Sequence, residues 1–342
     1  MNKRALCYDD VLLKPQYSDI QSRAEIDIST NLGEGVVLTM PVLASPMDTV
    51  TEGAMAIAVG KQGGAGIVHR YNPIEQEARQ VRRAKDVAGD INVGAAVGVT
   101  GDYLDRAIAV CEAGATFLCV DVAHGHHLLM KGSLHQLRNL IGDKFHIMAG
   151  NVATLEGIND LADWGATSVR CNIGGGSICS TRVQTGHGMP GLQTILDCAQ
   201  TDRDVAIIAD GGIRNSGDIV KALAAGADAV MCGSLFAGST EAPGEIFRDT
   251  DGSVWKSYRG MASKEAQTDW RGRYASLEGV ATRIPYQGKV IDTLTELDRG
   301  IRSGLSYSGA RSLDEFRAKA EFIKQTNSGL AESQTHILTR KW

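Results

Sequence analysis

The sequence contains no long hydrophobic run and no cluster of basic residues. Its 342 residues include 35 Lys and Arg against 40 Asp and Glu, which gives a formal net charge of -5. Proteins that bind nucleic acid use basic side chains to neutralise phosphates, so this balance argues against such a partner. No apolar stretch approaches the roughly 18 residues of a membrane span, and the N-terminus reaches Asp9 and Asp10 without the apolar segment of a secretory signal. We therefore predict a cytoplasmic protein that makes no use of a membrane.

Cysteine occurs at seven positions, an odd number, and no two of them form a C-x-x-C pair. This pattern argues against a disulfide framework and against a zinc site. Most free cysteines are small buried side chains. A cysteine becomes reactive only where its surroundings favour the thiolate, so its context decides whether it matters.

Proline is scarce, with 7 residues, whereas glycine is abundant, with 40. Short β-branched runs recur, and each is followed by a loop with Gly or Asp and then by a helical pattern. The eight runs that we expect to be strands cover residues 42–44, 65–68, 91–95, 117–120, 146–149, 168–171, 205–209 and 229–232. The clearest helical patterns cover residues 102–113, 154–164 and 216–225, and a further helix is expected over 312–326.

Apolar strands that alternate with helices indicate a parallel sheet covered by helices. Eight such units predict an α/β fold of the closed (β/α)8 TIM barrel type rather than an open doubly wound sheet. No G-x-G-x-x-G follows the first strand, which disfavours a dinucleotide-binding sheet. We expect residues 1–342 to form this single catalytic domain. Residues 240–290 are polar and Gly-rich, and we expect an irregular flap or lid there.

The active site of such a barrel lies at the carboxyl ends of its strands. Glycine turns follow the seventh and eighth expected strands, at Gly211-Gly212 and Gly233, and their backbone N–H groups suit a phosphate. Asp210 precedes the first turn, where a carboxylate suits the hydroxyl groups of a ribose. These features predict a site for a nucleoside monophosphate, and the alternative is that both are simply tight turns.

The loop after the sixth expected strand carries three glycines, then Ser177, Cys179 and Thr181. A cysteine at the mouth of a barrel suits a nucleophile that attacks an electrophilic carbon of a bound base. An isolated cysteine is otherwise usually inert. Carbonyl groups freed in such a loop also suit a monovalent cation.

Eight segments match the pattern of one family in the right order. They are YDDVLLKP at 8–15, PMDTVTE at 46–52, DVAHGH at 121–126, AGNVAT at 149–154, GGGSICSTR at 174–182, ADGGIRNSGDI at 209–219, GSLFAG at 233–238 and YRGMAS at 258–263. By these segments the chain resembles the IMP dehydrogenase and GMP reductase family nearly from end to end.

The resemblance implies that Cys179 attacks C2 of the purine nucleotide and that Thr181 assists as an acid or base. It implies that Asp210 binds the ribose, while Asp121 and Asn151 face the nicotinamide of the cofactor. The groups implied to hold the 5′-phosphate are Ser177, Gly212, Gly233, Ser234 and Tyr258, and those implied to contact the purine are Met261 and Ala262. The carbonyl groups of Gly174, Gly176 and Cys179 match the potassium loop of the family, whose barrels assemble as homotetramers.

The two family enzymes share a purine–cysteine intermediate and differ in how that intermediate reacts. The dehydrogenase uses NAD and then hydrolyses the intermediate with the help of an Arg-Tyr pair on a long flap. The reductase releases ammonia and takes hydride from NADPH. Here Glu278 follows only five residues after Arg273, a short spacing that is similar to the reductase, in which the matching glutamate pairs with the threonine at Thr181. We therefore predict a GMP reductase that forms IMP, with Glu278 as a third catalytic residue; the alternative for Glu278 is a solvated loop carboxylate.

The regulatory CBS insertion of many dehydrogenases would follow the second strand, where residues 68–91 leave room only for a helix. Other features favour the dehydrogenase. DVAHGHH, KSYRGM and ESQTH at 332–336 are similar to dehydrogenase segments, Arg273-Tyr274 matches the dyad, and Ala275 replaces an arginine of animal-type reductases. The alternative is thus an NAD-dependent IMP dehydrogenase without CBS domains, which makes XMP. A third hypothesis, a non-catalytic nucleotide-binding protein, has no need for Cys179, Thr181 and Asp210 together.

Overall fold

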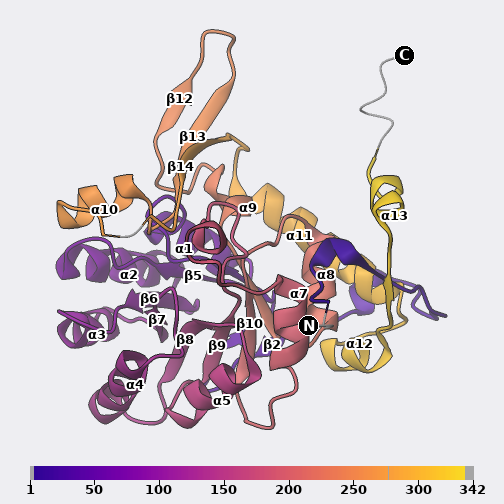
Figure 1. Cartoon of the computed structure of the whole chain (residues 1–342), viewed down its shortest axis with the longest axis horizontal. Helices are drawn as coiled ribbons and strands as arrows, with labels where there is room; N and C mark the ends of the chain where they lie inside the picture. The colour runs from indigo at the N-terminus through magenta and orange to yellow at the C-terminus, as the bar shows by residue number, and fades with distance from the viewer. Residues whose placement is uncertain (1–3, 276, 336–342) are drawn as a thin grey trace.

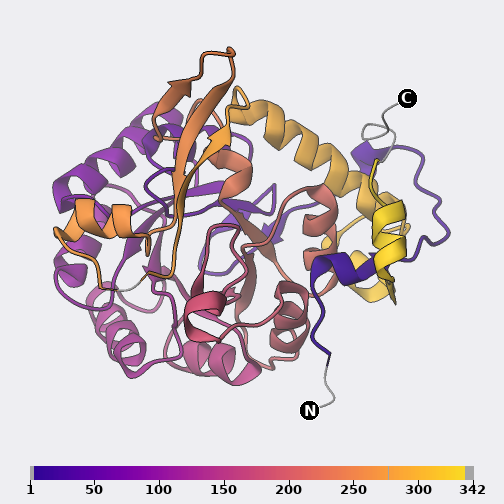
Figure 2. The ribbon, with the colours of Figure 1, turned by 45° about the horizontal axis from the view of Figure 1, so that its top comes forward.

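The computed structural model describes residues 4–275 and 277–335. Eight parallel strands form a closed barrel in the order β10-β11-β4-β5-β6-β7-β8-β9, and Figures 1 and 2 show the ring of helices around it. The strands are β4 (Val42–Ala44), β5 (Ala65–Val68), β6 (Val93–Val97), β7 (Phe117–Asp121), β8 (His146–Val152), β9 (Ser168–Cys171), β10 (Ala206–Asp210) and β11 (Ala229–Cys232). The predicted TIM barrel and all eight expected strands are therefore confirmed.

The helices between the strands cover the outside of the barrel. They are α1 (Gly53–Lys61), α2 (Ile74–Ala88), α3 (Tyr103–Glu112), α4 (Leu128–Ile141), α5 (Leu155–Asp163), α7 (Gly191–Cys198), α8 (Ser216–Ala224) and the short α9 (Ser234–Ala237). The three helices expected from their periodicity are confirmed as α3, α5 and α8. The interval between β5 and β6 holds one helix, α2.

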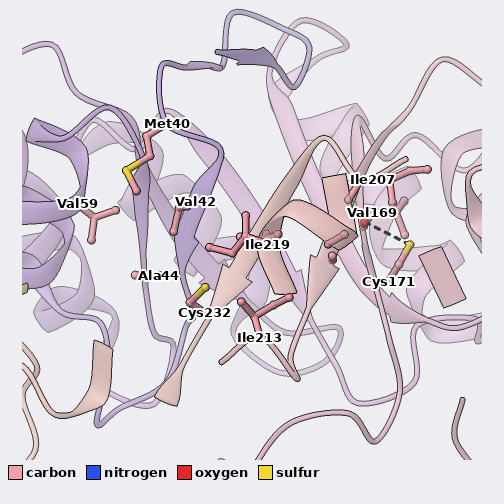
Figure 3. Packing of buried hydrophobic residues seen from close by; sticks show 14 of the residues in the cluster. Met40, Val42, Ala44, Val59, Val169, Cys171, Ile207, Ile213, Ile219 and Cys232 are labelled. Atoms are coloured by element: carbon pink, nitrogen blue, oxygen red, sulfur yellow. Dashed lines mark hydrogen bonds between the residues drawn. The ribbon is translucent and has the colours of Figure 1, made fainter. Parts of the chain in front are cut away.

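Each strand of the barrel divides its side chains between two buried layers. Leu43, Phe117 and Met148 belong to a cluster in the barrel interior, whereas Val42 and Ala44 belong to the larger cluster between strands and helices. Figure 3 shows part of that larger cluster, with Cys232 beside Val42 and Ala44. This alternation follows from the period of two in a strand, and it makes the barrel a filled core rather than a pore.

Residues 240–290 are more regular than the expected flap. They form an antiparallel sheet of β12 (Ile246–Arg248), β13 (Val254–Arg259) and β14 (Ala281–Pro285), which projects from the barrel in Figure 1, and the helix α10 (Lys264–Arg271). The prediction of an irregular segment was wrong because β13 and β14 pair residues that lie roughly 22 to 30 positions apart, beyond the reach of a local pattern.

The prediction of a single helix over 312–326 was also wrong, because the helix is much shorter. Helix α12 (Leu313–Lys319) is capped by Ala320, and the chain then forms β15 (Phe322–Lys324) and α13 (Asn327–Glu332). Strand β15 pairs with β1 (Val11–Leu13) near the other end of the chain, so a distant partner overrides the helical pattern.

Several shorter elements and one long helix complete the fold. They are the one-turn 3-10 helices η1 (Tyr8–Asp10) and η2 (Arg23–Glu25), the hairpin β2 (Thr30–Asn31) and β3 (Val37–Leu38), α6 (Thr181–Thr185) and the long α11 (Val290–Ser306). Among the described residues, no helix is long and apolar enough to span a membrane. The last residue of the ESQTH segment lies outside the described residues.

Candidate active site

A cavity of about 410 Å³ lies at the carboxyl ends of the strands. Its walls contain every residue that the sequence predicts for the site: Asp121, Asn151, Gly174, Gly176, Ser177, Cys179, Thr181, Asp210, Gly212, Gly233, Ser234, Tyr258, Met261, Ala262 and Glu278. The structure thus gathers these positions around one space, although their individual roles remain predictions.

Cys179 begins a line of three side chains at the mouth of this cavity. Its thiol donates to the hydroxyl oxygen of Thr181 at 3.1 Å. The Thr181 hydroxyl donates in turn to a carboxylate oxygen of Glu278 at 2.9 Å. Cys179 is exposed and the other two are half-buried, so a ligand can reach the sulfur while the carboxylate polarises the hydroxyl from behind.

The backbone of residues 277–280 fixes this line from the side of the flap. Cys179 and Gly279 form an isolated antiparallel bridge. The N–H of Ser180 donates to the carbonyl of Glu278 at 3.0 Å, and the N–H of Val280 donates to the carbonyl of Ile178 at 3.0 Å. These bonds hold the glutamate against the cysteine loop even though the two segments lie 97 residues apart.

The two glycine turns meet at one end of the cavity. Gly211 and Gly212 have φ values of 85° and 79°, a left-handed conformation that favours glycine. A Cβ atom on Gly233 would lie 3.1 Å from the hydroxyl oxygen of Tyr258, so only glycine leaves this space open. Tyr258 is hydrogen-bonded with Ser177 at 3.5 Å, and burial raises the pKa of Tyr258, which keeps its hydroxyl protonated as a donor.

Asp210 is held by two neighbouring side chains at the floor of the cavity. Its Oδ2 accepts from Nδ2 of Asn151 at 2.7 Å and from Nη2 of Arg170 at 2.8 Å. No hydrogen bond to Oδ1 is formed within the described part of the chain, so that oxygen is available to a ligand hydroxyl. Asp121 also pairs with Arg170, which therefore bridges the carboxylates expected to face ribose and nicotinamide.

Arg170 was not predicted from the sequence as a site residue. It is 7% exposed, and although burial acts against its charge, Asp210 and Asp121 hold its pKa above the ordinary range. The available signal was a charged residue within an otherwise buried strand, β9, because such residues are rarely buried without a partner. Arg70, Gln267 and Arg271 line the cavity as well and were also not predicted.

The carbonyl groups expected to bind potassium lie beside a guanidinium group. Arg182 donates to the carbonyl of Ile173 at 3.4 Å and also to that of Met189. The carbonyl of Gly176 accepts from the N–H of Cys179 at 3.1 Å. Carbonyl oxygens are the kind of ligand that a hard cation prefers, but the Arg182 side chain already places a positive charge beside this loop, so potassium binding stays a prediction.

The Arg273-Tyr274 pair lies apart from this cavity. Within the described residues, neither side chain lines its walls. Tyr274 is half exposed, and the ammonium of Lys264 lies 5.1 Å from its ring centroid. The arginine that does reach the cavity from this region is Arg271, at the end of α10.

A closed parallel barrel that opens at the carboxyl ends of its strands onto an accessible thiol has the architecture of a barrel enzyme. A profile for the "IMP dehydrogenase / GMP reductase domain" matches residues 5–336. The chain belongs to this family, whose members are purine-nucleotide oxidoreductases that use nicotinamide cofactors.

Known relatives carry both enzyme names. An inosine-5′-monophosphate dehydrogenase from Nitrosopumilus maritimus is 33% identical over 470 aligned residues, which cover 98% of each chain. Because 470 positions exceed the 342 residues here, that relative contains segments with no counterpart in this chain. A GMP reductase from Leishmania major is 31% identical and covers 98% of this chain and 97% of its own length. The crystal structure of a cysteine-to-alanine variant of the GMP reductase from Trypanosoma brucei, in complex with guanosine 5′-monophosphate, matches with a TM-score of 0.93 and 30% identity over 98% of both chains.

Proposed function

We propose that this protein is a GMP reductase, which converts GMP to IMP and ammonia with NADPH. The observation that carries the proposal is the line from Cys179 through Thr181 to Glu278, with spacings of 3.1 Å and 2.9 Å. A hydroxyl backed by a carboxylate suits the delivery of a proton to a departing amine.

In the proposed reaction the sulfur of Cys179 forms a bond to C2 of the purine. The bond from C2 to the exocyclic nitrogen breaks, and the nitrogen leaves as ammonia with a proton supplied through Thr181 and Glu278. NADPH, when bound, supplies the hydride that C2 receives. The carbon–sulfur bond then breaks, so that IMP leaves and the thiolate is restored. The overall reaction takes GMP, NADPH and one proton to IMP, ammonia and NADP⁺.

The remaining site residues are proposed to hold the nucleotide in place for this attack. Ser177, Gly212, Gly233, Ser234 and Tyr258 surround the proposed phosphate end, and Met261 and Ala262 line the cavity beside the proposed purine position. Asp210 would accept from the ribose through its available Oδ1. Asp121 and Asn151, joined to Asp210 through Arg170 or directly, would form the wall toward the nicotinamide.

Several broader predictions accompany this function. We propose a single barrel domain over residues 1–342 that acts in the cytoplasm as a homotetramer, with residues 240–290 as its flap. The loop carbonyls of Gly174, Gly176 and Cys179 would bind potassium.

The alternative is an NAD-dependent IMP dehydrogenase. It is favoured by the Arg273-Tyr274 pair, which matches the dyad of those enzymes, and by relatives that bear that name. A dyad that activates water must reach the reacting carbon, whereas here Tyr274 lies under Lys264 outside the cavity wall. This geometry favours the reductase.

One pair of assays separates the two functions. Purified protein is mixed with GMP and NADPH, and separately with IMP and NAD, while the absorbance of the reduced nicotinamide is followed. The reductase consumes reduced cofactor in the first mixture only. Production of reduced cofactor in the second mixture only would show that the protein is the dehydrogenase.

A further inference from the structure

The Gly211-Gly212 turn, at the proposed phosphate end of the cavity, is followed by Arg214, whose side chain forms two ion pairs. Arg214 follows Gly211-Gly212-Ile213, and its backbone N–H and its Nε both donate to Oδ2 of Asp218 at 3.0 Å. Asp218 lies in the first turn of α8, and its side chain is 3% exposed. The residue after the turn is thus attached to the helix by its main chain and by its side chain.

The same guanidinium also holds the N-terminal segment. Nη1 of Arg214 donates to Asp9 at 2.9 Å and Nη2 donates to the other carboxylate oxygen at 2.5 Å. This hydrogen bonding lowers the pKa of Asp9, so both oxygens are available as acceptors at neutral pH. The contact joins positions that are 205 residues apart and gives Asp9 of the YDDVLLKP segment a structural partner.

The N-terminal segment places a buried ring below the turn. Tyr8 is 5% exposed, and an atom of its ring lies 3.9 Å from where a Cβ on Gly212 would be. Nζ of Lys221 in α8 donates to the carbonyl of Tyr8 at 2.8 Å. The Gly211-Gly212 turn therefore has the Tyr8 ring close to Gly212 and the Arg214–Asp218 contact directly after it.

The C-terminal part of the chain secures the N-terminal segment in turn. Gln325 donates from its backbone N–H to the carbonyl of Asp10 at 2.9 Å and from its side chain to the carbonyl of Asp9 at 2.7 Å. Helix α13 contacts η1, and the two lie side by side in Figure 2. The position of Asp9 is thus fixed by the C-terminal part of the chain, and Arg214 is bonded to it.

We propose that Arg214 is a positioning residue for the 5′-phosphate site, acting through Asp9 and Asp218. This inference rests on the proposed function, because it takes the glycine turns as the place where the phosphate binds. Arg214 is not itself a ligand of the phosphate: two carboxylates already occupy its guanidinium, and it is absent from the residues that line the cavity. It acts by fixing the backbone N–H donors of the turn, whose value to an anion depends on their direction.

The test compares two ligands that differ only in the phosphate, GMP and guanosine. Dissociation constants for both are measured with the full-length protein, the Arg214→Met variant and the Arg203→Met variant. Arg203 is the matched control, since it also joins two carboxylates, Asp163 at 3.0 Å and Asp202, on the surface away from the cavity. Thermal unfolding of each variant establishes that it is folded.

We expect Arg214→Met to weaken GMP binding roughly tenfold, the scale of one charge-assisted hydrogen bond, and to leave guanosine binding unchanged. Arg203→Met should change neither constant. Unchanged GMP binding in Arg214→Met would overturn the proposal, and so would an equal loss for GMP and guanosine, which indicates a general structural role. If Arg214→Met does not fold, Asp9→Asn decides by the same comparison. A wild-type protein that binds guanosine as tightly as GMP would instead show that the phosphate site itself is wrong.

Discussion

At the scale of single residues, the proposed chemistry depends on three side chains from two distant segments. Cys179 lies in the loop after β9 and Thr181 begins α6 directly after it, whereas Glu278 comes from the chain between α10 and β14. The thiol donates to the hydroxyl and the hydroxyl donates to the carboxylate, so a proton can pass along the line when the sulfur becomes nucleophilic. Each member can be removed without altering the packed core, because none is fully buried.

Replacement of Cys179 by Ala should abolish turnover, with a loss of at least ~10³-fold, because no other group forms the bond to C2. Binding of GMP should persist, since the proposed phosphate and ribose contacts are made by other residues. Steady-state rates and a dissociation constant for GMP check both parts. A variant that turns over normally would show that the covalent mechanism does not operate here.

Replacement of Glu278 by Gln should slow the release of ammonia by ~10²–10⁴-fold, the usual contribution of a positioned acid or base. The amide keeps the size of the side chain but does not take the proton from Thr181. Glu265→Gln is the control, because Glu265 is an exposed acid in α10 of the same region. Ammonia release from GMP measures the effect, and equal rates in the two variants would contradict a role for Glu278.

The sequence predicted which residues line the cavity better than it predicted the ion pairs between them. The matched segments supplied Cys179, Thr181 and Asp210, and all three line one cavity. They did not supply Arg170, since its role depends on two carboxylates, Asp121 and Asp210, that approach it only when the strands are side by side. A pattern along the chain contains residue types, whereas an ion pair across strands requires the register of the sheet.

At the scale of elements, His146 joins three separate parts of the fold. It begins β8, and its ring is hydrogen-bonded with Ser168 of β9 at 2.8 Å and with the carbonyl of Gly33 in the β2–β3 hairpin at 3.1 Å. Burial lowers the pKa of His146 from 6.5 to about 4. The folded state therefore favours the neutral form of the His146 ring.

This lowered pKa predicts a loss of stability in mild acid. Below pH 6.5 the His146 ring is protonated in the unfolded chain, whereas in the folded chain it is protonated only below about pH 4. The stability present above pH 6.5 should thus fall as the pH drops toward 4, by up to about 3 kcal/mol at about 1.4 kcal/mol per pH unit. Urea unfolding across this range measures the free energy.

His146→Asn should be less stable at neutral pH and should show a smaller decrease over the same pH interval. His135→Asn, a change at an exposed position in α4, serves as the control and should keep the decrease of the wild type. Equal pH dependence in the wild type and His146→Asn would show that another group is responsible.

The strands were predictable because burial on both faces leaves a continuous apolar run. Runs such as 65–68 and 229–232 coincide with β5 and β11. The terminal helix was predicted to run to residue 326 because its local pattern contains no information about β1. Strand β15 forms by pairing with that strand, and so the error is one of tertiary context rather than of propensity.

At the scale of the whole molecule, closure of the barrel brings the first and last barrel strands together. Val230 of β11 pairs with Val42 of β4, and β15 pairs with β1 near the two ends of the chain. The sheet of β12, β13 and β14 projects away from this body (Figure 1). The residues that line the cavity run from Ser45 to Gly279.

The proposed homotetramer gives a prediction at this scale. Light scattering coupled to size exclusion should give a mass four times the 36.4 kDa of one chain. A mass of 36.4 kDa for an active species would contradict the tetramer.

Removal of potassium by dialysis should lower activity if the loop carbonyls bind that ion, and addition of KCl should restore it.

The fate of the purine on Cys179 tests the proposed mechanism most directly. Protein is incubated with radiolabelled IMP and NADP⁺, and an acid-quenched, digested sample is examined for label on the peptide that contains residue 179. A second sample receives ammonia before the quench. The covalent reductase mechanism predicts labelled Cys179 in the first sample and labelled GMP in the second. Label that never reaches Cys179, or that leaves it as XMP while ammonia has no effect, would contradict this mechanism.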